Sequence, residues 1–291
     1  MIFNYYFLKT VLGLTSIYLV CGLGNSITMK SGDMNLGGEG QIYAGGFTAA
    51  LFLNSASSLS AFIALPLAFL LSGLAGTILC LVSCYLKKIK NISFLLSSFI
   101  ISSALIPILN GLITGPFRTT QGTLLATPFI PQNFRYSYLI NLFVAILIAI
   151  LIFIFLKKSE SGKEITFYGM APEYALFMGI NETKILTLSS VITGFLHGIA
   201  GALVVCGIHY TCHCNFSSGM GWNALAAAMI ANASPILLIP SSLFMAFLIT
   251  TADQYALFNN FNFDISTLIQ AIIIIIVSFP FFTKALKGGK K

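Results

Sequence analysis

The polar stretch "GDMNLGGEGQIYAGG", from Gly32 to Gly46, places two carboxylates and two amides in a strongly apolar chain. Carboxylates near a membrane are costly and usually face a bundle interior or a polar cavity, where they can hydrogen-bond a solute. Asp33, Glu39 and Gln41 therefore favour a polar cavity. Two simpler interpretations stay open: the small residues could merely let helices pack closely, and Asp33 could pair with Lys30 at a membrane edge.

A second group of reactive side chains lies in "HYTCHC", which with Cys206 offers His209, Cys212, His213 and Cys214 as nitrogen and sulfur ligands. Zinc accepts such ligands. The segment lacks a paired CxxC spacing, so we expect no metal. A disulfide from Cys206 to Cys212 or Cys214 and free thiols remain equal alternatives.

Catalytic chemistry has little support elsewhere in the sequence. His197 lies among glycines on an apolar helix, which favours a packed or interhelical hydrogen-bonding role. No arrangement of serine, histidine and aspartate or of paired carboxylates stands out as an active site. The chain also lacks the GxxxxGK[ST] phosphate loop. We expect neither an enzyme nor a cofactor of its own.

The elements that position these groups follow from composition. With 57% hydrophobic and 8% charged residues in 291, the chain cannot cover a soluble globule with polar surface. Continuous apolar runs of roughly 20 residues predict an all-α transmembrane bundle forming one domain over residues 1–291. Nine crossings are expected, at Thr10–Met29, Gln41–Leu53, residues 61–86, Asn91–Gly111, Tyr138–Leu156, Ile185–Ile208, Trp222–Ser234, Pro235–Ala252 and Ile265–Thr283.

The basic residues predict the orientation of this bundle. If the hydrophilic loop 157–184 is inside, twelve of the fifteen Lys and Arg residues lie on that side, and only Lys9, Arg118 and Arg135 lie outside. This is the positive-inside bias. We expect the N-terminus outside and the C-terminus in the cytosol, and the net charge of +7 needs no nucleic-acid partner.

The two short crossings occupy corresponding places. Each follows a full helix and a Gly-rich loop, and each precedes a long helix with an early proline, Pro66 or Pro235. In the expected topology they run in opposite directions, so residues 10–156 and 185–283 form inverted halves. Paired, Gly-interrupted short segments of this kind are typical of a transport pathway.

Three collinear motifs add a family resemblance. "MNLGGEGQ", Met34 to Gln41, resembles the "FNIGxEGQ" signature of the membrane permeases of ABC importers for nucleosides and simple sugars, relatives of ribose and branched-chain amino-acid permeases. "GKEITFYGMAPEYALFMGI" is similar to the family's cytosolic "G...RAVGxNPxAARYAGI". "ITGFLHGIAGAL" with "GMGWNALAAAMIANASP" resembles "LSGALAGLAGA" with "GxGFxGIAVALLGxxNP". One departure is "NISFLLSSFI", Asn91 to Ile100, which lacks the Glu and final Asn of the family's "NEVISTLMLN".

The resemblance implies a bacterial inner-membrane permease for nucleosides or simple sugars, driven by a separate ATPase that binds the ATP. It also implies a second permease, more often different than identical, an external binding protein or lipoprotein, and contact with lipid. The expected solute path uses Asn35, Gly37, Gly38, Glu39, Gln41, Gly219, Gly221, Asn223 and Asn232. The expected coupling helix, Pro172 to Ile180, uses Pro172, Glu173, Tyr174, Leu176, Phe177, Gly179 and Ile180. The alternative function is a secondary transporter or channel driven by an ion gradient.

Overall fold

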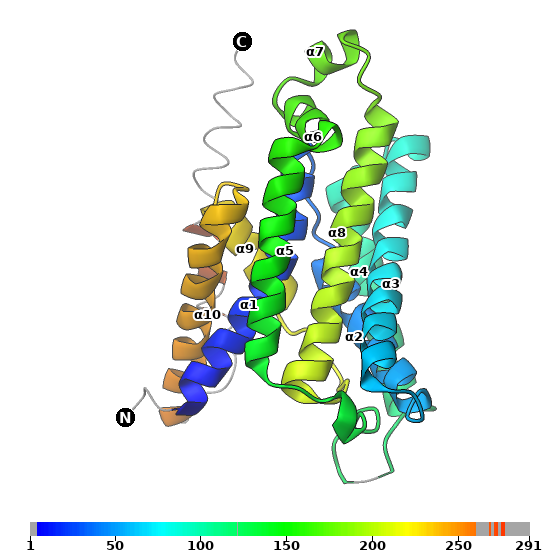
Figure 1. Cartoon of the computed structure of the whole chain (residues 1–291), viewed down its shortest axis with the longest axis vertical. Coiled ribbons are helices and arrows are strands. Elements are labelled where there is room, and N and C mark those ends of the chain that lie inside the picture. Colours follow the sequence, from blue (N-terminus) through cyan, green and yellow to red (C-terminus); the bar gives the residue numbers. More distant parts are fainter. Residues whose placement is uncertain (1–4, 121, 260–267, 269–270, 273–274, 277–291) are drawn as a thin grey trace.

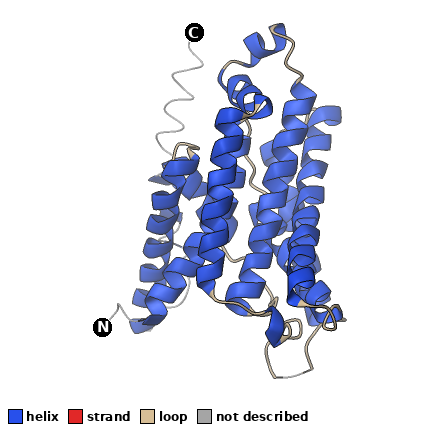
Figure 2. Ribbon diagram, in the orientation of Figure 1, coloured by secondary structure: helices blue, strands red, loops and turns tan. Residues whose placement is uncertain are grey.

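The computed structural model describes residues 5–120 and 122–259, with residues 268, 271, 272, 275 and 276, and within them it is helical with no strand (Figures 1 and 2). The all-α prediction is confirmed. The elements are α1 (Tyr5–Lys30), α2 (Gly38–Ser55), α3 (Ala61–Lys90), α4 (Phe94–Thr114), η1 (Gln132–Phe134), α5 (Tyr138–Lys158), α6 (Glu160–Met170), α7 (Pro172–Phe177), α8 (Glu182–Val204), the π-helical turn η2 (Val205–His209), α9 (Met220–Ile230) and α10 (Pro235–Phe258).

The expected count of nine membrane crossings is not confirmed. Among the described residues, six helices are long and apolar enough to cross: α1, α3, α4, α5, α8 and α10. The 18-residue α2 falls outside this set because its glycines and polar residues make it less apolar, and α9 falls outside because it has only 11 residues. The ninth expected crossing, Ile265–Thr283, lies outside the continuously described residues.

The bundle has two distinct ends. Helices α6 and α7 lie together at one end, called the α6–α7 end, and the segment between α4 and α5 lies at the other (Figure 1). Lys184 of α8 bonds Glu164 of α6, which places the start of α8 at the α6–α7 end. In the described chain this end carries Lys30, Lys87, Lys88, Lys90, Lys157, Lys158, Lys163 and Lys184, whereas Lys9, Arg118 and Arg135 lie at the opposite end.

The core forms around α1 and α8, which are the most buried of the long helices. Close backbone contact makes this possible: a Cβ on Gly198 of α8 would overlap the carbonyl oxygen of Ser72 on α3. Small residues at such crossings let the helices approach closely and gain dispersion contacts. These contacts matter because the hydrophobic effect does not drive helices together within lipid. The two central helices therefore hold fixed positions against which the shorter α2 and α9 pack.

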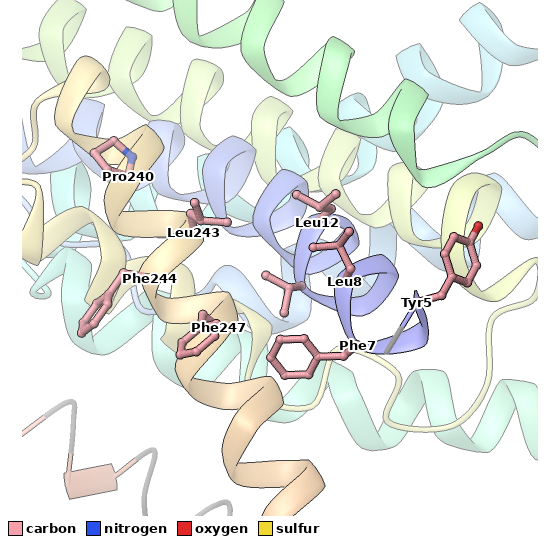
Figure 3. A pocket seen from close by; sticks show the side chains of 9 residues that line it. Tyr5, Phe7, Leu8, Leu12, Pro240, Leu243, Phe244 and Phe247 are labelled. Atoms are coloured by element: carbon pink, nitrogen blue, oxygen red, sulfur yellow. The ribbon is translucent and has the colours of Figure 1, made fainter. Parts of the chain in front are cut away.

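Helix α10 runs antiparallel to α1 on the outside of this core. Leu238 near its start contacts the region of Gly22, and Phe247 meets Phe7 edge to face at 5.7 Å between ring centroids. Beside Phe7 and Phe247 the two helices leave an apolar hollow of about 700 Å³ (Figure 3). The start of α10 thus lies toward the α6–α7 end, so α9, which precedes it, runs toward that end.

Candidate functional site

The first turns of α2 and α9 meet inside the bundle. Gly38 opens α2, and an added Cβ on it would lie 3.2 Å from the Cα of Gly221 in the first turn of α9. A Cβ on Gly221 would in turn lie 2.6 Å from the backbone nitrogen of Glu39, closer than real Cβ atoms come. From this meeting point α2 runs to the end opposite α6 and α7, and α9 runs the other way. Both breaks in the helices are therefore present in the fold.

Glu39 joins the two short helices. Its side chain is 8% exposed, and its Oε1 accepts hydrogen bonds from the backbone N–H groups of Gly221 at 2.9 Å and Trp222 at 3.4 Å. The first N–H groups of a helix lack partners within the helix, and the helix dipole places partial positive charge there. The carboxylate caps α9 while it lies in the first turn of α2. The negative charge of one buried acid therefore lies next to the N-termini of both α2 and α9.

A cluster of amides and an imidazole lies next to this contact. The backbone N–H of Gly37 donates to Asn35 Oδ1 at 2.8 Å, and Asn35 Nδ2 donates to Gln41 Oε1 at 2.9 Å. His197 of α8 places Nδ1 2.6 Å from the same Gln41 oxygen and Nε2 3.0 Å from the carbonyl oxygen of Cys21. These side chains are buried. The cluster fixes the loop before α2 to both central helices, and it gives His197 the interhelical role favoured by the sequence.

Two serines of α4 hold the same segment from the other side. Ser98 Oγ accepts from the backbone N–H of Leu36 at 3.1 Å, and Ser102 Oγ accepts from that of Gly40 at 2.7 Å. Ser102 satisfies a donor in the first turn of α2 that has no helical partner, and Ser98 satisfies one in the loop before it. The sequence reasoning missed them, although the serine pairs in "SSFIISS" were a visible polar feature of an apolar helix.

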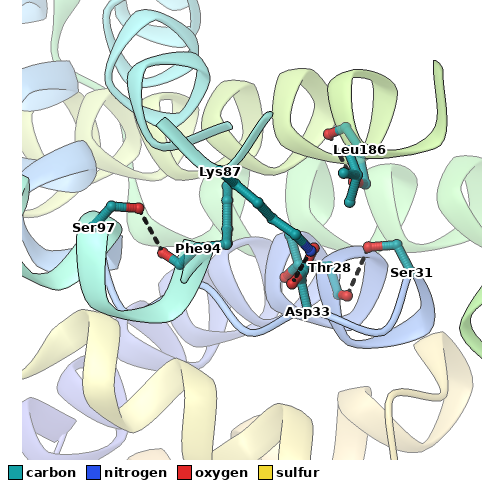
Figure 4. A network of polar contacts seen from close by, with 8 residues as sticks. Thr28, Ser31, Asp33, Lys87, Phe94, Ser97 and Leu186 are labelled. Carbon is teal, nitrogen blue, oxygen red and sulfur yellow. Dashed lines mark hydrogen bonds and ion pairs between the residues drawn. The ribbon is translucent and has the colours of Figure 1, made fainter. Parts of the chain in front are cut away.

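Asp33 makes an ion pair, although its partner differs from the one considered from the sequence. Lys87 Nζ lies 2.7 Å from both carboxylate oxygens of Asp33, so the loop after α1 is tied to the last turn of α3 (Figure 4). The alternative pair with Lys30 is wrong because Lys30 ends α1 itself, while the loop turns Asp33 toward α3. The residue therefore anchors the loop at the α6–α7 end.

The expected path residues fall into two groups. Eight of them lie at or beside the meeting point of α2 and α9: Asn35, Gly37, Gly38, Glu39, Gln41, Gly219, Gly221 and Asn223. Asn223 Nδ2 donates to the hydroxyl of Tyr18 at 3.0 Å, while its buried Oδ1 has no hydrogen-bond partner. Asn232 is exposed in the turn between α9 and α10 and lies apart from them. Their role in a solute path stays a prediction.

The expected coupling segment lies at the α6–α7 end and is shorter than predicted. Helix α7 begins at Pro172, with Glu173 in its first turn, and ends at Phe177 rather than Ile180. Gly179 has a left-handed φ of +84°, which stops the helix. Tyr174 is 72% exposed and Phe177 93%, and Leu176 is also exposed, whereas Ile180 packs against the core. The apolar surface of α7 therefore excludes Ile180.

Helix α6, where the sequence predicts a hydrophilic loop, connects α7 to the end of α1 and the loop before α2. A Cβ on Gly169 in its last turn would overlap the carbonyl oxygen of Lys30. Beside it, burial and then the nearby Glu182 raise the pKa of Tyr168 to about 12. Because the backbones of α6 and of the end of α1 are in direct contact, neither can move toward the other. A displacement of α6 in that direction would therefore also displace the loop that leads into α2.

The histidine and cysteine loop lies near η2, before α9. All six cysteines are free thiols, and no group of three or more potential metal ligands forms among the described residues. The rings of His209 and His213 lie 5.0 Å apart, and His213 lies 6.0 Å from Phe216. The segment forms a ring cluster instead of the disulfide considered from the sequence.

Known proteins match this chain over nearly its whole length. It is 31% identical over 279 residues, covering 94% of this chain and 74% of the relative, to the "Probable riboflavin import permease protein RfuC" of Treponema pallidum. It is 24% identical to the guanosine ABC transporter permease of Bacillus subtilis, covering 99% and 85% of the two chains. It is 22% identical to the glucose ABC transporter permease of Haloferax volcanii, covering 93% and 76%.

The family described as "Branched-chain amino acid transport system / permease component" matches residues 7–278. That range contains the short helices α2 and α9, α6, α7 and all the long helices of the described chain except the first two residues of α1. It also agrees with the three motifs that carry the resemblance. This chain therefore belongs to the branched-chain amino acid transport system / permease component family of ABC transport permeases.

Proposed function

We propose that the chain is the membrane permease subunit of an ATP-driven importer for nucleosides or related sugar-containing solutes. The single observation that supports this most is the meeting of two short, oppositely directed helices at Glu39 and Gly221. Discontinuous helices expose amide groups within a membrane, and transporters place them where a solute or a conformational change uses them. Relatives named for riboflavin, guanosine and glucose share a sugar or sugar-like hydroxyl-bearing part, which amide side chains can recognise.

The proposed orientation puts the α6–α7 end in the cytosol and the N-terminus outside. Eight lysines at that end of the described chain support it, because short cytosolic segments carry the excess of Lys and Arg. The exposed Tyr174, Leu176 and Phe177 then form the surface that docks in a groove of a separate ATPase. The ATP is bound by that partner, and the permease needs no cofactor.

The remaining partners follow from the family. A second permease, different from this one more often than identical, completes the pathway, and an external binding protein or lipoprotein delivers the solute. In the conformation described, Gly38 and Gly221 touch, so solute does not pass between them in this state. ATP-driven motion transmitted through α6 would then switch the accessible side.

The ion-gradient alternative has less support. Ion coupling usually requires an ionisable group available within the membrane. Asp33 is paired with Lys87 at one end, and the Glu39 carboxylate already accepts backbone N–H groups of α9. Neither of these carboxylates is free to bind and release an ion without breaking these contacts. Asp253 of α10, the third candidate, also has an interaction partner.

Reconstitution tests the proposal. The permease is placed in vesicles with its neighbouring ATPase, second permease and binding protein, and uptake of labelled nucleoside, riboflavin, ribose and galactose is measured with and without ATP. ATP-dependent uptake of one of these solutes is the expected result. Uptake by the chain alone under an ion gradient, independent of ATP, would establish the secondary transporter instead.

A further inference from the structure

A second hollow lies on the bundle surface between α3 and α8. It has a volume of about 460 Å³ and is lined by Ile78, Leu81, Val82, Cys84, Tyr85 and Lys88 of α3 and by Thr187 of α8. Ile78 is 62% exposed and Tyr85 60%, so their side chains face outward from the bundle. The hollow is therefore a groove on the membrane-facing side, near the α6–α7 end.

The lining of the groove changes from apolar to cationic along its length. Residues 78, 81, 85 and 88 share one face of α3, because side chains three or four positions apart are neighbours on a helix. The face begins with the apolar Ile78 and Leu81, continues with the phenol of Tyr85 and ends with the ammonium of Lys88. Tyrosines are enriched where a membrane meets water, and lysines extend toward the headgroups. The groove thus has an apolar part at membrane depth and a cationic part at the surface.

Unlike Lys87 and Lys184, Lys88 has no internal counter-charge among the described residues. Lys87 pairs with Asp33 at 2.7 Å, and Lys184 at the start of α8 pairs with Glu164 at 3.0 Å. In the part of the chain that the structure describes, no ion pair involves Lys88, which is exposed. The positive charge of the groove is therefore available to an external anion.

We propose that this groove binds an anionic phospholipid, with one acyl chain along Ile78, Leu81 and Val82 and the phosphate at Lys88. Basic pockets between helices on the cytosolic side bind anionic headgroups through this combination of charge and apolar contact. Tyr85 and Thr187 add hydroxyl groups that can donate to phosphate or ester oxygens. The larger hollow between α1 and α10 has no charged lining residue, so charge complementarity singles out the smaller groove. The proposal rests on the proposed orientation, which places Lys88 at the cytosolic face of a membrane, and it does not depend on transport.

Native mass spectrometry of the purified full chain tests this. The chain in detergent is incubated with equal amounts of phosphatidylglycerol and phosphatidylcholine that carry the same acyl chains. We expect at least fivefold more retained phosphatidylglycerol than phosphatidylcholine. Lys88→Gln should remove this preference, whereas Lys90→Gln, the same change on the same helix end but outside the groove lining, should keep it. Ile78→Trp, which fills the apolar part, should lower retention of phosphatidylglycerol at least fivefold.

Three outcomes would overturn the proposal. Equal retention of the two lipids by the unmodified chain would remove the charge argument. An equal loss in Lys88→Gln and Lys90→Gln would show a diffuse electrostatic effect of the helix end. A dimer that Ile78→Trp dissociates, with phosphatidylglycerol retention unchanged, would assign the groove to a second permease. Because the exposed Lys88 and Lys90 make no internal ion pair among the described residues, both variants should fold, and their melting temperatures provide the check.

Discussion

Replacing Glu39 by alanine should destabilise the bundle far more than loss of an ordinary carboxylate. The change leaves the N–H of Gly221, bonded at 2.9 Å, and the longer-bonded N–H of Trp222 without an acceptor inside the protein. A buried donor left without a partner costs about 1–3 kcal/mol. Counting the Gly221 bond fully and the 3.4 Å Trp222 bond lightly gives about 2–4 kcal/mol of lost unfolding free energy.

The assay can use the only tryptophan of the chain, since Trp222 lies in the first turn of α9. Unfolding of the purified chain in mild detergent is followed by its fluorescence as denaturant is added. Glu160→Ala is the matched control, because Glu160 is also a carboxylate in the first turn of a helix but is exposed. Loss of such an exposed interaction should cost about 0.3–1 kcal/mol.

Glu39→Gln separates hydrogen bonding from charge. The glutamine oxygen can still accept from Gly221, so its loss of stability should lie between the alanine variant and the unmodified chain. If Glu39→Ala and Glu160→Ala unfold at the same denaturant concentration, the carboxylate does not hold α9 and the reasoning fails. A larger loss in Glu39→Gln than in Glu39→Ala would also refute it.

The other predictions concern the α6–α7 end. Gly169→Ala should lower transport per ATP hydrolysed about tenfold while the ATPase still binds, because a Cβ there would displace the end of α1. Gly111→Ala is the control, because an added Cβ at Gly111 would meet nothing within 4 Å. A proportional loss of transport and of ATP hydrolysis in Gly169→Ala would contradict the prediction. Phe177→Ser, at a side chain 93% exposed, should weaken co-purification of the ATPase at least tenfold without changing the melting temperature of the permease. Lys87→Met should cost about 1–3 kcal/mol of unfolding free energy, because it leaves Asp33 unpaired. Adding Asp33→Asn should recover part of this loss. If the losses of the two single variants simply add up in the double variant, the ion pair does not stabilise the fold.

The sequence predicted the breaks in the helices because their cause is local. The glycines before α2 and α9 interrupt apolar runs, and the runs that follow are too short for a full crossing. Helix α6 also has a local signal in the sequence, because Ser159 accepts from the N–H of Gly162 as an N-cap and Glu160 follows it. The early end of α7 likewise follows from the left-handed Gly179.

The partners of the polar residues could not be predicted in this way. Asp33 has one lysine three residues away and bonds another 54 residues away, and Gln41 meets a histidine 156 residues away. Periodicity fixes which face of a helix a residue occupies, but several helices could have faced that side. Which of them does so depends on contacts such as Gly38 against Gly221, which require both helices to be placed first.

The contact between α2 and α9 sets a condition on any motion of the permease. Separating Glu39 from Gly221 would expose the same donors as the alanine variant, at a cost of about 2–4 kcal/mol. Since 1.4 kcal/mol corresponds to a factor of ten, the joined state would outnumber a separated state by roughly 30- to 700-fold in the chain alone. A partner can reverse that ratio only through contacts that differ between the two states. Gly169 of α6 contacts the end of α1, so α6 is the element through which a bound ATPase could bias this equilibrium. If α2 and α9 do not separate, their contact at Gly38 and Gly221 allows the two helices to move together.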